Sequence, residues 1–349
     1  LMLGCSVAIA DGMSLKDIAQ LEQIGQVAVS PTSETMAVTK IVPRQVGVDE
    51  DGRAWSELHI IDAQGEMHPY ITGEVNVSSI GWTPDGQTVT FVAKREGDEH
   101  AHLYGISTNG GEARRLASPS GSVRGYSFSP DGEQVALVIA PPEPQALSEL
   151  KDKGFSQIIF EEQWRANELI IQTLDGEHRT LELEGSVQQV QWSPSGDRLA
   201  IAVTPRQLVD DTLMFQKIRI IDTDGALIGR VDNPGKLGRM VWSPSGEHLA
   251  FLGTTVVRDP REGRLLVAGK EGGPFTELMP GLEGHVWHLG WHGDDIMFIS
   301  YEGVETRLGQ IAPNGENERT LSQSPDLIFQ SLSVNARGDI ALVATRPSH

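Results

Sequence analysis

The stretch FEEQWRANEL, residues 160–169, gathers charged and aromatic side chains that could bind a ligand. Glu161 and Glu162 supply adjacent carboxylates, and Arg165 supplies a guanidinium close by in the chain. A carboxylate attracts an ammonium group, and a guanidinium donates hydrogen bonds to a carbonyl or carboxylate oxygen. These residues could therefore form a polar rim that holds the amino terminus of a peptide. The alternative interpretation is a solvated edge strand without a ligand.

Further charged residues lie in other long segments between expected strands, and we take them as candidates for the same rim. They are Arg44, Arg206, Asp210 and Asp211. Long loops on a rigid scaffold are where binding residues usually lie. Together with Glu161, Glu162 and Arg165 they form the predicted substrate-gating set, which contains no predicted catalytic residue and no predicted metal ligand.

Motifs of catalytic or metal sites are not found in the sequence. The string nearest to the nucleophile elbow G-x-S-x-G is GYSFS, residues 125–129, which lacks the final glycine and precedes an expected hairpin. His288 and His292 share one face of an expected strand, but about 13 Å separates them at ~3.3 Å per residue. Zinc ligands bind at about 2 Å, so one ion does not reach both. DEDG (49–52) and DTDG (222–225) are interpreted as turns, and we predict no metal and no cofactor.

A motif of the form aromatic-Ser/Thr-Pro-x-Gly recurs along the chain. The full copies are WTPDG (82–86), FSPDG (128–132), WSPSG (192–196) and WSPSG (242–246). Proline presets the backbone of a turn and glycine closes the turn with a positive φ, so each copy predicts a hairpin. Degenerate copies near residues 29–32, 291–294 and 334–338 bring the number to seven. Their spacing is close to the period of about 40–50 residues that is typical of propeller blades.

A second hairpin follows six of the seven copies, for example at DAQG (62–65) and DTDG (222–225). Two hairpins per repeat predict four-stranded antiparallel blades, which must stack to bury both faces. The predicted fold is all-β: a seven-bladed β-propeller of four-stranded blades, the seventh incomplete, with a short N-terminal helix. The blades are expected to start near residues 25, 77, 123, 187, 237, 286 and 329.

The chain divides into three predicted segments, of which residues 25–349 are the propeller. Residues 11–24 contain the helix and lead-in, because Ser14 and Asp17 fit a capping box before apolar residues at helical spacing. Residues 1–10, LMLGCSVAIA, are interpreted as the remnant of a signal peptide with an A-x-A cleavage site, which favours a periplasmic or secreted protein. A lipoprotein anchor at Cys5 and an ordinary folded start are the alternatives.

The overall charge limits the classes of partner. The chain has 349 residues, with 28 Lys and Arg against 48 Asp and Glu, which gives a net charge of −20. Such a surface repels nucleic acids and anionic membranes, so neither is a predicted partner. No stretch reaches the ~20 consecutive apolar residues of a membrane-spanning helix. The single cysteine, Cys5, excludes an intrachain disulfide.

Several segments carry a resemblance to a known family. They are LKDIAQLEQIGQVAVSPT (15–32), VNVSSIGWTPDGQTVTFVAKR (75–95), LKDKGFSQIIFEEQW (150–164) and SLSVNARGDIALVATRPSH (331–349). With the turn repeats, they resemble the N-terminal propeller of the prolyl oligopeptidase family of serine peptidases, especially bacterial acylaminoacyl-peptidase-like and dipeptidyl-peptidase-like members. The resemblance covers nearly the whole chain.

The resemblance implies a propeller that filters peptide substrates by size and lines a cavity beside an α/β-hydrolase domain. The implied partner is a peptide substrate, bound together with that hydrolase domain, which is absent from these residues. No residue of this chain matches the family's catalytic Ser, Asp or His, so no catalytic residue is carried over. We expect the 349-residue chain alone to have no peptidase activity.

Two other functions remain as alternatives. One is a stand-alone periplasmic propeller of the Tol-Pal type that acts as a binding or scaffold protein. That protein has an α/β domain before its propeller, and residues 11–24 are too few for one. The other is a propeller enzyme with its site in the central channel, which needs carboxylates or histidines that converge from several blades.

Overall fold

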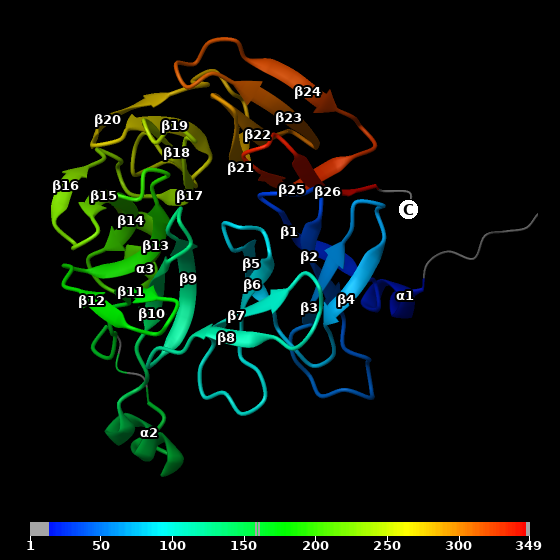
Figure 1. Cartoon of the computed structure of the whole chain (residues 1–349), viewed down its shortest axis with the longest axis vertical. Helices are drawn as coiled ribbons and strands as arrows, with labels where there is room; N and C mark the ends of the chain where they lie inside the picture. The colour runs from blue at the N-terminus through cyan, green and yellow to red at the C-terminus, as the bar shows by residue number, and fades with distance from the viewer. Residues whose placement is uncertain (1–13, 158, 160, 347–349) are drawn as a thin grey trace, which may run out of the picture.

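The computed structural model describes residues 14–157, 159 and 161–346. Within them, six antiparallel four-stranded sheets follow one another around a centre in chain order, and a two-stranded hairpin lies between the last sheet and the first (Figure 1). The strands, sheet by sheet, are β1 (Gln23–Val29), β2 (Met36–Val42), β3 (Trp55–Ile61), β4 (Met67–Ile71); β5 (Ser78–Trp82), β6 (Thr88–Ala93), β7 (His102–Ser107), β8 (Arg114–Ala117); β9 (Ser122–Phe128), β10 (Gln134–Ala140), β11 (Glu168–Thr173), β12 (His178–Leu181); β13 (Ser186–Trp192), β14 (Arg198–Thr204), β15 (Lys217–Asp222), β16 (Leu227–Arg230); β17 (Leu237–Trp242), β18 (His248–Gly253), β19 (Arg264–Gly269), β20 (Gly272–Glu277); β21 (His285–His292), β22 (Asp295–Glu302), β23 (Glu305–Ile311), β24 (Arg319–Gln323); and the hairpin β25 (Ile328–Val334) with β26 (Ile340–Thr345).

The prediction of a seven-bladed propeller is wrong. The described residues form six four-stranded blades, and among them β25 and β26 pair only with each other. The error has a simple cause: one copy of the turn motif specifies one hairpin, whereas a four-stranded blade needs two. The all-β propeller architecture itself is present.

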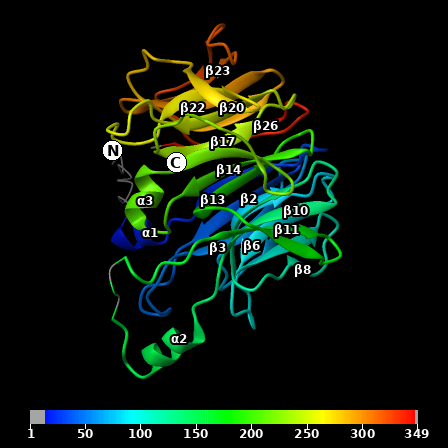
Figure 2. The same ribbon diagram turned by 90° about the vertical axis from the view of Figure 1, so that its left-hand side faces the viewer.

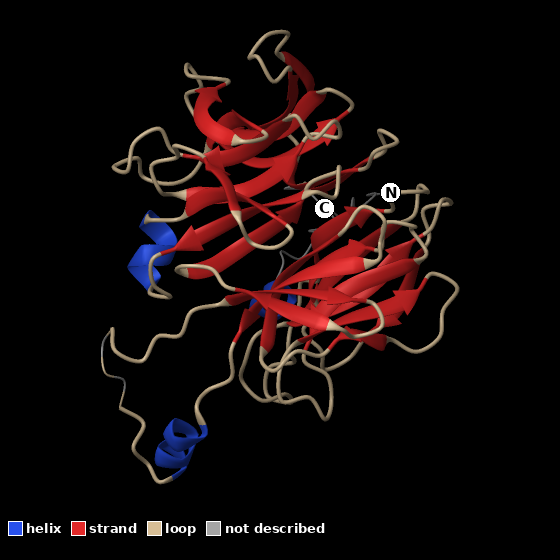
Figure 3. Cartoon of the chain, turned by 60° about the vertical axis from the view of Figure 1, so that its left-hand side comes forward, coloured by secondary structure: helices blue, strands red, loops and turns tan. Residues whose placement is uncertain are grey.

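The fold contains three helices among the described residues, where the sequence predicted one: α1 (Leu15–Ala19), α2 (Gln145–Asp152) and α3 (Val209–Met214). The predicted capping box of α1 is confirmed, because Asp17 N donates to Ser14 Oγ at 3.2 Å and Ser14 N donates to Asp17 Oδ2 at 2.8 Å. Two acidic residues stand in the first turn of α3, where carboxylates interact favourably with the helix dipole. Residues 1–10, the predicted signal-peptide remnant, lie outside the described residues. Figure 3 shows one helix at the edge of the strands and another at the end of a long loop that extends away from them.

The tryptophans of the repeat tie blades to their predecessors. Three indole N–H groups donate to a backbone carbonyl of the preceding blade: Trp82 to Ala28 at 2.9 Å, Trp242 to Gln191 at 3.2 Å and Trp291 to Val241 at 3.1 Å. Trp192 differs, since its indole donates to Gly196 O in its own turn at 3.1 Å. The aromatic position of the motif therefore both fills space between blades and fixes their relative position.

The turns of successive repeats also touch each other. In three of the four full copies, the glycine that closes the turn has φ of 73–75°, and its missing Cβ leaves room for the proline of the repeat before it. The pairs are Gly132 with Pro84, Gly196 with Pro130 and Gly246 with Pro194, with the proline Cδ 3.6, 3.7 and 3.8 Å from the position of a Cβ. The recurring dozen residues thus build contacts between neighbouring repeats as well as turns.

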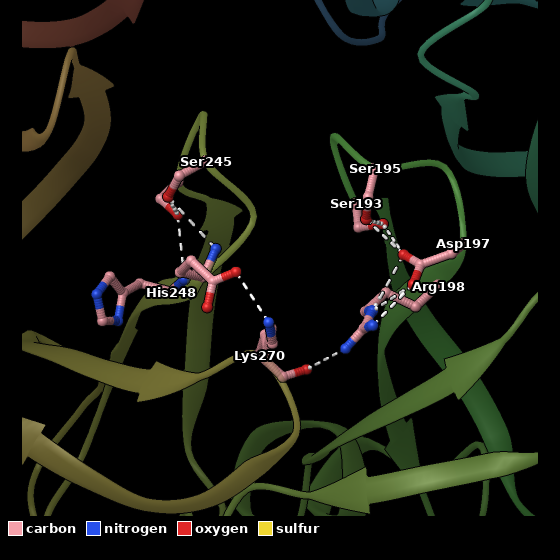
Figure 4. A network of polar contacts seen from close by, with 9 residues as sticks. Ser193, Ser195, Asp197, Arg198, Ser245, His248 and Lys270 are labelled. Carbon is pink, nitrogen blue, oxygen red and sulfur yellow. Dashed lines mark hydrogen bonds and ion pairs between the residues drawn. The ribbon is translucent and has the colours of Figure 1, made fainter.

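Charged side chains add a network between the fourth and fifth blades on this turn face (Figure 4). Arg198 forms an ion pair with Asp197 at 2.7 Å and donates to the backbone oxygen of Lys270 at 3.4 Å. Lys270 Nζ in turn pairs with Glu247 at 2.8 Å. Hydrogen bonds from Arg198 first, and then from Ser195, hold the pKa of Asp197 well below its ordinary value.

The core consists of apolar layers between blades. Each of six clusters of buried side chains joins two adjacent sheets, for example Leu169 and Ile171 on β11 with Val190 and Trp192 on β13. Polar contacts join the closing hairpin β25–β26 to the first blade, where the ring closes. They are Val29 N to Ser333 Oγ at 3.0 Å, Asn335 Nδ2 to Ser30 O at 2.7 Å and Arg337 Nη1 to Thr32 O at 2.7 Å.

Candidate functional site on the long-loop face

Three long connections lie on one face of the propeller. They span residues 43–54, 141–167 and 205–216, and each joins the second strand of a blade to the third. Because the strands alternate in direction, connections of this kind emerge at the same end of every blade. Figure 2 shows α2 and α3, which lie in the second and third connections, on the same side of the sheets. We call this end of the molecule the long-loop face.

Arg206 joins two of these loops. Its guanidinium donates to both carboxylate oxygens of Asp211 at 2.9 and 3.2 Å, and to Glu161 at 3.2 Å. Asp211 is 3% exposed, and the hydrogen bonds from Arg206 lower the pKa of its carboxyl group. The hydrogen bonds to Asp211 likewise raise the pKa of Arg206. This charge-assisted, bidentate pair fixes the start of α3 against the loop that carries Glu161.

A cavity of about 320 Å³ opens beside this ion pair. Its walls combine apolar side chains with two carboxylates, and they comprise Ile159, Glu161, Gln163, Trp164, Gln207, Leu208, Val209 and Asp210. Val209 is 74% exposed, and Leu213 and Phe215 nearby are 63% and 42% exposed. The arrangement suits an extended ligand with an apolar side chain and a positively charged end.

Arg165 lies deeper, in a second cavity of about 490 Å³ that shares Gln163, Trp164 and Gln207 with the first. Its Nη1 atom is buried, and no hydrogen-bond partner for it lies among the described residues. The second cavity in turn shares Arg124 and Gln188 with a third, of about 520 Å³, which is walled by β5, β9 and β13. The three cavities form a series from the long-loop face to the central channel.

The remaining predicted residues stand apart. Arg44 stacks over the ring of Trp55 at 3.9 Å and donates to Arg53 O and Glu50 O, so it stabilises its own loop. Glu162 is exposed to solvent. The structure therefore groups Glu161, Arg206, Asp210 and Asp211, places Arg165 behind them, and leaves Arg44 and Glu162 outside the group.

The sequence analysis missed Arg124, Gln188 and Arg239, which lie on the first strands of three blades. The first strand of every blade and of the closing hairpin carries a shift of register near its start, a β-bulge or similar irregularity. Such an irregularity re-aims side chains out of the regular alternation. A signal was present, because apolar residues recur there at i and i+3 instead of i and i+2, as in Val123–Tyr126, Val187–Val190 and Leu237–Met240.

The structure also bears on the predicted turn at DTDG, on metal ligands and on membrane-spanning helices. Asp222 Oδ1 accepts hydrogen bonds from the backbone of Asp224 and Ala226, which confirms that DTDG is a turn. Among residues 14–157, 159 and 161–346, no three His, Cys, Asp or Glu side chains converge as metal ligands would. A search of the same residues finds no helix with the length and apolarity to cross a membrane.

Comparison with known proteins supports a peptidase-type propeller. Residues 30–145 match the family model of the dipeptidyl peptidase IV (DPP IV) N-terminal region. The chain is 31% identical to the uncharacterized peptidase YuxL of Bacillus subtilis (strain 168) over 134 residues, which are 38% of this chain and 20% of that protein. It is 23% identical to dipeptidyl-peptidase 5 of Porphyromonas endodontalis over 208 residues, 55% of this chain and 29% of that protein. The matched region thus spans less than a third of either relative.

Solved structures share the fold. Acylaminoacyl peptidase of Pyrococcus horikoshii superposes with a TM-score of 0.69 at 12% identity, covering 95% of this chain and 51% of that one. The β-propeller domain of the trilobed protease from Pyrococcus furiosus gives 0.65 at 12% identity, covering 95% and 92%. TolB from Acinetobacter baumannii gives 0.50 at 14% identity, covering 88% and 65%.

The chain is thus similar in sequence, over part of its length, to peptidase-family proteins, and it shares its fold with the propellers of such proteins. More narrowly, the resemblance to the N-terminal propeller of the prolyl oligopeptidase family is confirmed.

Proposed function

We propose that this propeller is the substrate-gating, cavity-lining portion of a serine peptidase that acts on peptides, and that an α/β-hydrolase domain supplies the catalysis. The observation that carries the proposal is the grouping on the long-loop face, where Glu161, Arg206 and Asp210 stand at the cavity of about 320 Å³. Carboxylates at its wall suit the amino terminus of a peptide, and the apolar wall suits a side chain.

The apolar side chains around α3 support a domain on this face. Val209, Leu213 and Phe215 are all exposed, although a protein surface usually scatters such residues singly. A catalytic domain that covers the long-loop face would remove them from water and would leave the cavities as the route for substrate. Peptides too bulky for this route would be excluded.

The test of the catalytic part uses a serine-directed fluorophosphonate probe. We expect the product of the uninterrupted reading frame to be labelled and to hydrolyse short peptides, because that frame would encode G-x-S-x-G after residue 349. The purified 349-residue chain is expected to stay unlabelled. A stop codon directly after the codon for His349, or labelling of the 349-residue chain, would contradict the proposal. A stop codon would favour the alternative, a stand-alone periplasmic binding propeller of the Tol-Pal type.

The gating part is tested separately in the longer protein. Val209→Asp places a charge at the cavity, so we expect it to lower kcat/KM for peptide substrates. Leu227→Asp on β16 is the matched control, because Leu227 is also exposed, at 45%, but lies on an outer strand. Equal effects of the two substitutions would refute a gating role for this cavity.

We also propose a periplasmic or secreted location, since residues 1–10 fit the end of a signal peptide. N-terminal sequencing of the native protein should find Asp11 as the first residue in the exported fraction. A lipid-modified Cys5 would indicate anchoring instead, and an unprocessed protein confined to the cytoplasm would contradict the proposed location.

A further inference from the structure

The walls of the inner cavities have an unusual composition for this chain. The cavities of about 490 and 520 Å³ share Arg124 and Gln188, and together they extend from Arg165 to the inner strands β5, β9 and β13. None of the described residues that line them is Asp or Glu, although 48 of the 349 residues are acidic. A strongly acidic protein thus encloses a space whose charged side chains are arginines.

These arginines have no acidic partner. Ion pairs within the described part of the chain use other arginines, such as Arg198 and Arg206, and none involves Arg124 or Arg165. The buried Nη1 of Arg165 has no hydrogen-bond partner among the described residues. A guanidinium withdrawn from water without a partner is costly, and proteins usually pair it. Arg165 is such a group, and the exposed Arg124 lines the same cavity, so the two cations together indicate a site for an anion from outside the protein.

Neutral side chains around the arginines are held in place. Gln207 Oε1 accepts hydrogen bonds from Gln188 Nε2 and Ser186 Oγ, both at 2.6 Å. With the carbonyl end of Gln207 occupied in this way, its amide N–H groups are free to donate on the opposite side. The cavity therefore has a preorganised neutral donor beside the two cations.

The inner strands themselves are cross-linked. Tyr126 Oη donates to Ser79 O at 2.8 Å, which joins the irregular segments of β9 and β5. Gln189 Nε2 donates to Gly238 O at 2.9 Å, which joins β13 to β17. The wall that carries Arg124 is thus rigid, so a ligand would meet a preformed site.

Farther around the inner strands, the same electrostatic character continues. Arg239 on β17 lies near His288 on β21, and burial and the charge of Arg239 lower the pKa of His288 to about 4. His288 is consequently neutral at pH 7. This pair therefore adds one positive charge, that of Arg239, to the inner strands.

We propose that the cavity between Arg124 and Arg165 binds an oxyanion, either the carboxylate of a peptide or a phosphate group. Planar guanidinium groups match both oxyanions with paired hydrogen bonds, and Gln207 adds a neutral donor. The inference does not depend on a catalytic domain, because every group it uses lies within the described residues.

Isothermal titration calorimetry of the purified 349-residue chain tests the site with three probes: triglycine, triglycinamide and inorganic phosphate. We expect heat of binding with triglycine or phosphate and none with triglycinamide, which lacks the carboxylate. Arg124→Gln and Arg165→Gln should each weaken binding about tenfold or more, since each removes a charge-assisted hydrogen-bonding group. Arg114→Gln on the outer strand β8 changes the net charge equally and should leave binding unchanged.

The outcomes separate the sources of the anion. Binding of triglycine without phosphate identifies a peptide carboxylate, and binding of phosphate without triglycine identifies a phosphate ligand; both support the site. Three outcomes would overturn the site. Neither triglycine nor phosphate binds, or triglycine and triglycinamide bind equally while phosphate does not bind, or Arg124→Gln leaves the affinity unchanged. Thermal unfolding checks that each variant is folded. If Arg165→Gln does not fold, the affinity of Arg124→Gln alone tests the site.

Discussion

The contacts that close the ring allow a quantitative prediction for Asn335. This side chain, 7% exposed, donates from Nδ2 to Ser30 O at 2.7 Å, across the junction between the closing hairpin and the first blade. Its Oδ1 accepts from Arg337 N at 3.0 Å and Asp339 N at 2.9 Å, which shapes its own turn. The substitution Asn335→Ala removes both kinds of contact.

Asn314 provides a matched control for the local part. It shapes the turn between β23 and β24, where its Oδ1 accepts from Glu316 N at 3.0 Å, but it is exposed. Asn314→Ala therefore measures the loss of a turn contact alone. Apart from one more contact within its own turn, the additional loss in Asn335→Ala is the bond to Ser30, a residue that is fully buried, and an unpaired buried carbonyl costs about 1–3 kcal/mol.

Urea unfolding of the wild-type chain and both variants measures the difference. We expect Asn335→Ala to lower the free energy of unfolding by about 1–3 kcal/mol more than Asn314→Ala does. Equal effects of the two substitutions would refute the argument that hydrogen bonds across the junction hold the ring closed.

Further predictions concern the repeat and its charges. Trp242→Phe keeps an aromatic ring but removes the hydrogen bond to Gln191 O, so it should destabilise the chain by about 1 kcal/mol in thermal or urea unfolding, whereas Trp287→Phe at an exposed position should have little effect. Equal losses would contradict the role of the indole N–H in joining blades. Because the pKa of Asp197 is lowered in the folded chain, its ionised form stabilises the fold above about pH 4, the unfolded value, and this contribution is lost as the pH falls through the folded pKa. The urea midpoint of Asp197→Asn should thus lie below that of the wild type at pH 7, and the gap should begin to narrow as the pH is lowered below about 4; a constant gap would show that the effect is not electrostatic.

The turn residues of the repeat made the propeller predictable, since Pro84 and Gly86 or Pro194 and Gly196 specify local geometry that needs no tertiary context. The number of blades was predicted wrongly, because Asn335 to Gly338 form a turn of the same kind in a hairpin whose two strands pair only with each other among the described residues. The helix α3 was missed, since its short sequence is stabilised by tertiary contacts such as the pairing of Asp211 with Arg206.

The candidate site was predictable only in part. Glu161, Arg206 and Asp211 belong to segments that sequence length identified as long loops, but their meeting depends on how α3 folds back. Arg124 lies in an inner strand, where a regular alternation of side chains would direct it between blades. The irregular backbone changes that direction, and the only signal of it in the sequence is the i, i+3 spacing of apolar residues such as Val123 and Tyr126.

The contact between a turn glycine and the proline of the repeat before it has a consequence for the descent of such chains. The repeats with prolines 130 and 194 each supply a glycine to the repeat before and a proline to the repeat after, so a duplicate of such a unit would fit beside it without any change in the units that flank it. The opposite face has no such shared rule, and its loops between second and third strands range from the two-residue segment 303–304 to the insertion at 141–167. Gene duplication can therefore add blades that fit together at the turn face. The loops on the opposite face can change in sequence and length without disturbing these contacts, so a chain can gain new ligands while it keeps the same scaffold.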